Sequence, residues 1–303
     1  MGKDSAGTTI RFDNRTIEEF AASLRLSPRS VVSYKRCLAY FFSYLEETGA
    51  VRPESGDIAA YREALSASGK RAATVHNYLA AVKAFFRWAA AEGLYRDIAG
   101  KVSHPSVDHA PRRKTLTGAQ MKRVLESIDR GDVRGKRDYA LLALMVTGGL
   151  DTLEAARATA GDLKRSRTGP VLHIRGVRGG VVRIPPRTWR ALVDYLEARG
   201  PVNEEAPLFA GLSNRTLGRE THMSTSSISR IVKEAFRGAG YDDVNLTAQS
   251  LRFTGVKLAL QGGERLEDVQ RFARHKTIRT TFLYEQAEPA AQEHGEAMKE
   301  GQG

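Results

Sequence analysis

The sequence feature that most constrains the fold is a break in the hydrophobic pattern at residues 104–114. This segment contains two prolines and has no helical period, whereas the stretches before and after it repeat apolar residues at helical spacing. Proline interrupts helices and central strands, so the segment predicts an exposed linker. With 303 residues and a prior of about 150 residues per domain, two domains are expected, at 15–103 and 115–286. Residues 1–14 are expected to be disordered, and residues 287–303 to form a C-terminal tail.

The first domain is predicted to be a small helical bundle. Apolar residues recur three and four positions apart in four stretches. Ser27 followed by Pro28 marks the start of the second helix, and the third helix is expected to follow Asp57. At this spacing an aromatic stripe favours a hydrophobic core over a surface that stacks on bases. The stripe consists of Phe41, Phe42, Phe85, Phe86 and Trp88.

The second domain is predicted to be mainly helical with one small β-hairpin. Thr117 and Gln120 have the spacing of a capping box, and a buried helix over residues 138–146 ends at two glycines. Residues 171–176 and 181–185 alternate apolar and polar side chains around a glycine-rich turn, which is typical of a hairpin. Further helices are expected over 188–199, 226–237, 247–261 and 266–273. The predicted fold class is mainly α (α+β).

The net charge of +12 predicts a polyanionic partner. Nucleic acid is the usual one for so basic a protein, although charge alone does not separate DNA from RNA, anionic lipid or a generally basic background. A single cysteine, Cys37, excludes an internal disulfide and a cysteine-based metal site. No apolar run is long enough to span a bilayer and no secretory signal is evident. A cytoplasmic, nucleoid-associated protein is expected.

The most specific motif lies near the C-terminus. The stretch 246–254, which contains Arg252, opens a predicted helix. His275 follows Arg252 after 23 positions, and Tyr284 follows after nine more. In this order and spacing the three residues resemble the active-site set of tyrosine recombinases, the phage and transposon integrase family. Residues 141–150, Glu154 and residues 161–163 resemble the family as well. The resemblance covers about residues 15–286 and implies a SAM-like core-binding domain and a catalytic-type domain that close around duplex DNA.

The resemblance also implies the chemistry. In the family a tyrosine attacks a DNA phosphate to form a 3′-phosphotyrosine, cationic side chains bind the phosphate oxygens, and a lysine on the hairpin protonates the leaving 5′-oxygen. Tyr284 stands at the nucleophile, Arg252 at the second arginine and His275 at the third basic position. Arginine suits such a site because its planar fork binds two oxygens. Neither ATP nor a metal is needed, so no cofactor is expected.

Three positions depart from the family pattern. Asp151 stands where the first arginine is expected, Val177 replaces the hairpin lysine, and Gln249 stands where histidine or lysine is usual. Gln249 can still donate a hydrogen bond, whereas Val177 removes the proton donor. Asp151 replaces a cation by an anion beside the phosphate, and one lost preorganised donor costs roughly 3 kcal/mol of transition-state stabilisation. Strand cleavage is therefore expected to be impaired or lost.

Structural alternatives exist for Asp151, His275 and Tyr284. Asp151 followed by Glu154 fits a helix N-cap or a first-turn anion. His275 could be a helix-start histidine, and Tyr284 an ordinary half-buried tyrosine. We also hypothesise an ion pair between Arg252 and Asp151, which would neutralise the pocket.

The leading functional hypothesis is a double-stranded DNA-binding protein of this family with impaired cleavage. One alternative is an active site-specific recombinase in which Arg157 or Arg178 replaces the lost groups, and another is a helical adapter that binds protein. Duplex DNA is the expected partner, with a homo-oligomer on DNA or a hetero-assembly with an active recombinase left open, and no membrane. Helix 226–237 is the expected major-groove reader. The residues expected to contact DNA are Lys35, Arg71, Lys83, Arg112, Arg113, Lys114, Arg178, Arg230 and Lys233.

Overall fold

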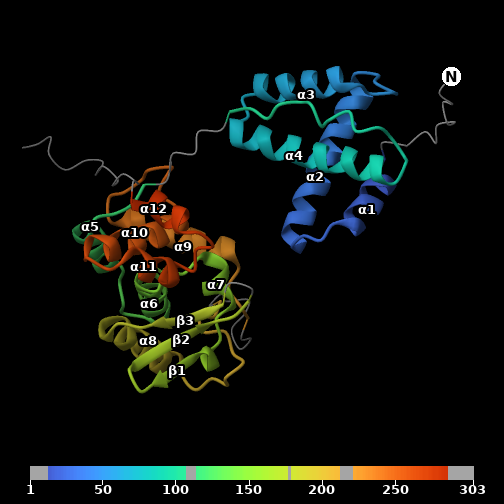
Figure 1. Cartoon of the computed structure of the whole chain (residues 1–303). Helices are drawn as coiled ribbons and strands as arrows, with labels where there is room; N and C mark the ends of the chain where they lie inside the picture. The colour runs from blue at the N-terminus through green and yellow to red at the C-terminus, as the bar shows by residue number, and fades with distance from the viewer. Residues whose placement is uncertain (1–12, 107–113, 177–178, 212–220, 286–303) are drawn as a thin grey trace, which may run out of the picture. The chain divides into compact units, whose positions relative to one another are not determined.

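The computed structural model describes residues 13–106, 114–176, 179–211 and 221–285. It divides into two compact units, residues 1–109 and 110–303 (Figure 1). The predicted tail, and residues 1–12 of the predicted N-terminal segment, lie outside the described residues. Among the described residues, no helix has both the length and the apolar run that crossing a membrane requires.

The described part of the first unit contains four helices, α1 (Asn14–Ser23), α2 (Pro28–Glu47), α3 (Ser55–Ala67) and α4 (Ala72–Ala91). The α2 start is confirmed, because the Ser27 side chain accepts a hydrogen bond from the Ser30 backbone N–H and Pro28 is the first helical residue. The predicted α3 start is wrong by three residues. Glu54 caps this helix, and Asp57 lies inside its first turn and accepts a hydrogen bond from the Glu54 N–H.

Aromatic side chains form much of the core of the first unit, as their spacing predicts. Phe41, Phe85 and Phe86 are fully buried. Aromatic rings in this core meet edge to face, and the Phe42 and Phe85 rings, for example, have their centroids 5.2 Å apart. Such pairs contribute about 0.5–1.5 kcal/mol beyond area burial. Trp88 is only partly buried and packs against Phe85. The aromatic stripe therefore packs α2 against α4.

The described part of the second unit combines eight α-helices, one 3-10 helix and one sheet. Its elements are α5 (Gly118–Glu126), α6 (Val133–Thr147), α7 (Thr152–Arg157), η1 (Ala160–Asp162), β1 (Leu163–Ser166), β2 (Gly169–Ile174), β3 (Gly180–Arg183), α8 (Pro186–Arg199), α9 (Thr225–Gly238), α10 (Ala248–Gln261), α11 (Leu266–Ala273) and α12 (Ile278–Glu285). The capping box of Thr117 and Gln120 is confirmed at the start of α5.

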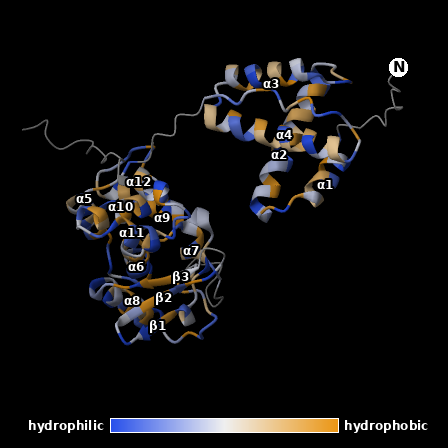
Figure 2. Ribbon diagram, viewed as in Figure 1, coloured by the Kyte–Doolittle hydropathy of each residue, from blue (hydrophilic) through white to orange (hydrophobic). Residues whose placement is uncertain are grey.

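The sheet is antiparallel in the order β1-β2-β3. The predicted hairpin corresponds to β2 and β3, whose apolar residues are coloured as hydrophobic in Figure 2. Leu172 is the register partner of both Leu163 and Val182, so one apolar row crosses all three strands. The sequence did not predict β1, because three of its four residues are exposed and polar.

Helix α6 lies at the centre of the second unit and packs against α8 and α10 (Figure 1). A side chain at Gly255 would place its Cβ 2.0 Å from the carbonyl oxygen of Val146. Only glycine therefore allows α10 to approach the α6 backbone this closely. This contact sets Arg252, three residues earlier on α10, beside the C-terminal end of α6.

Candidate active site

The candidate site begins at the turn after α6. Gly149 has a left-handed φ of +57°, and a Cβ there would meet the Phe272 ring at 3.0 Å. Asp151 then caps α7, because its Oδ1 accepts hydrogen bonds at 2.8 Å from the backbone N–H groups of Leu153 and Glu154. Glu154 Oε2 accepts from the Asp151 N–H at 2.8 Å in return. The N-cap interpretation of Asp151 is confirmed.

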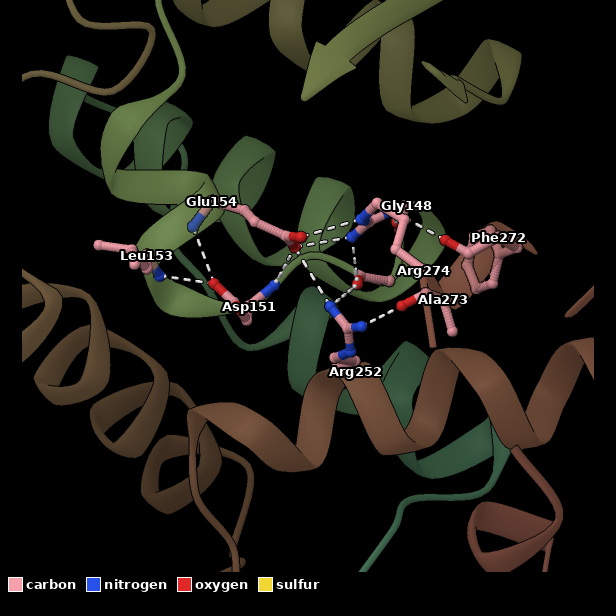
Figure 3. Close-up of polar contacts among 9 residues, drawn as sticks. Gly148, Asp151, Leu153, Glu154, Arg252, Phe272, Ala273 and Arg274 are labelled. Carbon is pink, nitrogen blue, oxygen red and sulfur yellow. Dashed lines mark hydrogen bonds and ion pairs between the residues drawn. The ribbon is translucent and has the colours of Figure 1, made fainter. Parts of the chain in front are cut away.

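Arg252 reaches this turn from α10 (Figure 3). Its side chain is 6% exposed. Nη1 donates to the Gly149 carbonyl at 3.0 Å and to Glu154 Oε2 at 3.2 Å, and Nη2 donates to the Ala273 carbonyl. The hypothesised ion pair with Asp151 is wrong. The shorter Asp151 side chain folds back onto its own helix, while Glu154 in the first turn extends to the arginine.

Arg274 also belongs to this cluster, although the sequence analysis assigned it no role. Its side chain is 6% exposed. Nε and Nη2 donate to the two carboxylate oxygens of Glu154 at 2.9 and 2.6 Å. Its other hydrogen bonds reach the carbonyls of Gly148, Gly149 and Phe272 (Figure 3). In the sequence, an arginine in a basic stretch cannot be told from one that is exposed to solvent. Only its tertiary contacts show that Arg274 is buried.

His275 and Tyr284 lie next to each other, as the motif predicts. Their ring centroids are 4.5 Å apart. Tyr284 on α12 is 8% exposed and stacks on Phe253 of α10, with centroids 3.7 Å apart and an interplanar angle of 15°. His275 Nδ1 lies 3.0 Å from Thr281 Oγ1. The helix-start interpretation of His275 is wrong, because this residue lies in the turn between α11 and α12.

The remaining predicted site residues are less informative. Gln249 is half-buried one turn before Arg252 on α10, and Arg157 is exposed at the end of α7. Val177 and Arg178 lie outside the described residues. Within the described ranges, no group of three or more histidine, cysteine, aspartate or glutamate side chains could hold a metal ion.

Several predicted DNA contacts are engaged within the chain. Lys35 pairs with Glu18, Arg230 pairs with Glu234 at 3.2 Å, and Lys83 donates to the Gly100 carbonyl at 3.4 Å. Arg71 is exposed before α4 and Lys233 is half-buried on α9, while Arg112 and Arg113 lie outside the described residues.

Lys114, at the end of the predicted linker, pairs with Asp243 at 2.6 Å. The hydrogen bond from Lys114, together with that from the Asn245 backbone N–H, holds the pKa of Asp243 below its ordinary value. The Lys114 side chain therefore contacts the second unit itself.

Comparison with known proteins finds similarity to recombinases and integrases. Residues 17–93 match the family described as "Phage integrase, N-terminal SAM-like domain". The chain is 29% identical over 285 residues to tyrosine recombinase XerD of Pseudomonas putida, covering 90% of this chain and 92% of that protein. It is 28% identical over 228 residues to tyrosine recombinase XerC of Corynebacterium efficiens, covering 71% and 68%.

Solved structures have the same fold. XerH site-specific recombinase bound to difH substrate aligns with a TM-score of 0.68 at 17% identity, over 90% of this chain and 82% of that one. A lambda integrase dimer bound to a COC′ core site aligns with a TM-score of 0.70 at 16% identity, over 95% and 99%. The architecture is thus that of the integrase-type recombinases. Over most of its length the chain is similar to tyrosine recombinases, and residues 17–93 match the phage integrase SAM-like domain.

Proposed function

We propose that this protein binds double-stranded DNA and is severely impaired in DNA strand cleavage. The observation that carries the proposal is the carboxylate at position 151, where the family resemblance implies a phosphate-binding arginine. Its Oδ1 is fixed by two backbone N–H groups at 2.8 Å. Losing one preorganised donor lowers a rate about 10²–10³-fold, and the negative charge adds repulsion of the phosphate.

The arrangement of Arg252 supports the same conclusion. Its guanidinium donates to two carbonyls and one carboxylate, and its side chain is 6% exposed. A phosphate would have to displace these acceptors or bind to the donors left over. A site that cleaves DNA needs such donors already directed at the phosphate.

DNA binding is supported by the net charge of +12 and by the nature of the relatives. XerH and lambda integrase were solved bound to their DNA sites, lambda integrase as a dimer. We propose a comparable assembly here, either of this chain alone or with an active recombinase. Binding through phosphates should weaken steeply with salt, because each neutralised phosphate releases counterions.

An active recombinase is the second candidate, and one observation favours it. Tyr284 and His275 adjoin, with ring centroids 4.5 Å apart, and Arg252 lies on the helix that carries the Phe253 ring beneath the tyrosine. A protein that only binds DNA has no need of this set.

Covalent trapping tests the proposal. A duplex site is first selected by binding from a random-sequence pool, and nicked versions of that site are then incubated with the natural protein, Tyr284→Phe and Tyr241→Phe. Tyr241 is the matched control, because its buried hydroxyl lies elsewhere in the second unit. We expect salt-sensitive binding by all three proteins and no denaturation-resistant adduct.

An adduct formed by the natural protein and by Tyr241→Phe, but not by Tyr284→Phe, would establish the active recombinase instead. Selection of no duplex at all would refute DNA binding and leave the protein-binding adapter.

A further inference from the structure

Two buried guanidinium groups meet at the same two oxygen atoms. Glu154 Oε2 accepts from Arg252 Nη1 at 3.2 Å and from Arg274 Nη2 at 2.6 Å. The Gly149 carbonyl accepts from the same two nitrogens at 3.0 and 2.8 Å (Figure 3). Two like charges are stable this close together only where an anion lies between them. Glu154, whose side chain is 13% exposed, is that anion.

Arg274 uses its whole hydrogen-bonding capacity inside the chain. A guanidinium has five N–H donors, and Arg274 makes five hydrogen bonds, two to Glu154 and three to backbone carbonyls. None is left for a phosphate oxygen. Its function in this cluster is therefore to hold other groups in place.

The backbone of Arg274 is itself unusual. With φ of +54° it is the only non-glycine residue of the described ranges in the left-handed region. Glycine adopts this conformation without the steric cost that a Cβ introduces. The side-chain contacts of Arg274 offset that cost, which indicates that this arginine is required where it stands.

We infer that Arg274 is a positioning residue that takes the place of the arginine missing at position 151. It holds Glu154 and the Gly149 carbonyl, the groups on either side of Asp151, and thereby fixes the turn that carries His275. This inference rests on the proposed function, because it explains how the site keeps its structure with a carboxylate at position 151.

The charges predict that arginines at positions 151 and 274 exclude each other. Arg252 and Arg274 carry two positive charges, and Glu154 and Asp151 carry two negative ones, so the cluster is balanced. An arginine at position 151 would bring a third guanidinium to a single carboxylate. If Arg274 were removed as well, two cations and one anion would remain, with one cation available to a phosphate.

The experiment compares the natural protein, Asp151→Arg, Arg274→Gly and the double variant Asp151→Arg/Arg274→Gly. Glycine suits the left-handed backbone, so the substitution removes the side chain without strain. A second double variant, Asp151→Arg/Arg271→Ala, is the matched control. Arg271 is a nearby arginine on α11 that is 78% exposed. Each protein is assayed for Tm and for covalent adduct on the selected nicked duplex.

We expect Asp151→Arg to lower the Tm by about 5 °C. Arg274→Gly, but not Arg271→Ala, should restore the part of that loss that comes from the third guanidinium, because the hydrogen bonds of the Asp151 cap stay lost in both double variants. The double variant with Arg274→Gly should give on the order of a hundredfold more adduct than Asp151→Arg alone. The adduct should disappear when Tyr284→Phe is added. A merely structural contact would change the Tm and leave the adduct yield unaltered.

Two results would overturn the inference. In one, Asp151→Arg matches the double variant in Tm and adduct yield, so the arginines do not compete. In the other, the Tm recovers without any gain in adduct, so Arg274 does not stand in for a residue of the phosphate site. The proposed function fails separately, through a Tyr284-dependent adduct of the natural protein.

Discussion

Replacing Glu154 by glutamine should destabilise the second unit more than its small change in size suggests. The carboxylate accepts four hydrogen bonds, one from the Asp151 N–H, one from Arg252 and two from Arg274. A glutamine would present an NH₂ group to guanidinium donors and would leave both arginines without their counter-ion. One N–H at least would lose its acceptor.

The expected loss follows from the burial of the pair. The Arg252 and Arg274 side chains are each 6% exposed and that of Glu154 is 13% exposed. Removing one partner of a buried ion pair costs about 3–5 kcal/mol. For a unit of this size each kcal/mol lowers the Tm by about 2–4 °C, so a decrease of roughly 10 °C is expected.

Tryptophan fluorescence can follow the second unit by itself. The chain has two tryptophans, Trp88 on α4 and Trp189 on α8, so a Trp88→Phe background leaves Trp189 as the reporter. Glu234→Gln is the control, because Glu234 pairs with Arg230 on the exposed surface of α9 and exposed pairs contribute about 0.2–1 kcal/mol. Equal changes in Tm for Glu154→Gln and Glu234→Gln would refute the role given to the buried cluster.

Two further predictions concern packing and pH. Gly255→Ala should lower the Tm of the second unit markedly, because its Cβ would lie 2.0 Å from a backbone oxygen of α6, whereas Gly56→Ala on α3 has open space and should raise stability by about 0.5–1 kcal/mol; a harmless Gly255→Ala would contradict the close approach of α10 to α6. Burial, with the neighbouring His76 and Lys83, lowers the pKa of His104 below its ordinary value. The folded chain therefore binds this proton less readily than the unfolded chain, so the contribution of His104 to stability is complete above the unfolded pKa and is lost as the pH falls through the lower, folded pKa. Thermal unfolding of His104→Gln should show a smaller decrease in Tm on acidification from about pH 7 to about pH 5 than the natural protein shows, and an identical decrease would exclude His104 as the source.

Features that depend on neighbouring residues were predictable from the sequence. The caps at Ser27 and Thr117 need only a hydroxyl and a backbone N–H three positions later, and both form. The β2–β3 pairing follows from alternation around a glycine-rich turn. The Asp151 cap is equally local, because its partners lie two and three residues away.

Features that depend on distant residues were not predictable in the same way. Arg252 pairs with Glu154, 98 positions away, and not with Asp151, because of how α7 faces α10. Arg274 reaches the same carboxylate across 120 positions. Strand β1 is nearly all polar, so it forms because its backbone pairs with β2 and not because of an apolar pattern of its own.

The carbonyls that accept hydrogen bonds from the two arginines lie at the C-terminal ends of helices. Gly148 and Gly149 follow α6, and Phe272 and Ala273 are the last two residues of α11. A helix C-terminus carries about half a negative charge from its aligned peptide dipoles. The guanidinium groups therefore oppose two helix dipoles as well as carboxylates, and the electrostatic potential at this cluster is less positive than its number of arginines suggests. The long-range attraction of the chain for a polyanion must then come from basic residues elsewhere on its surface.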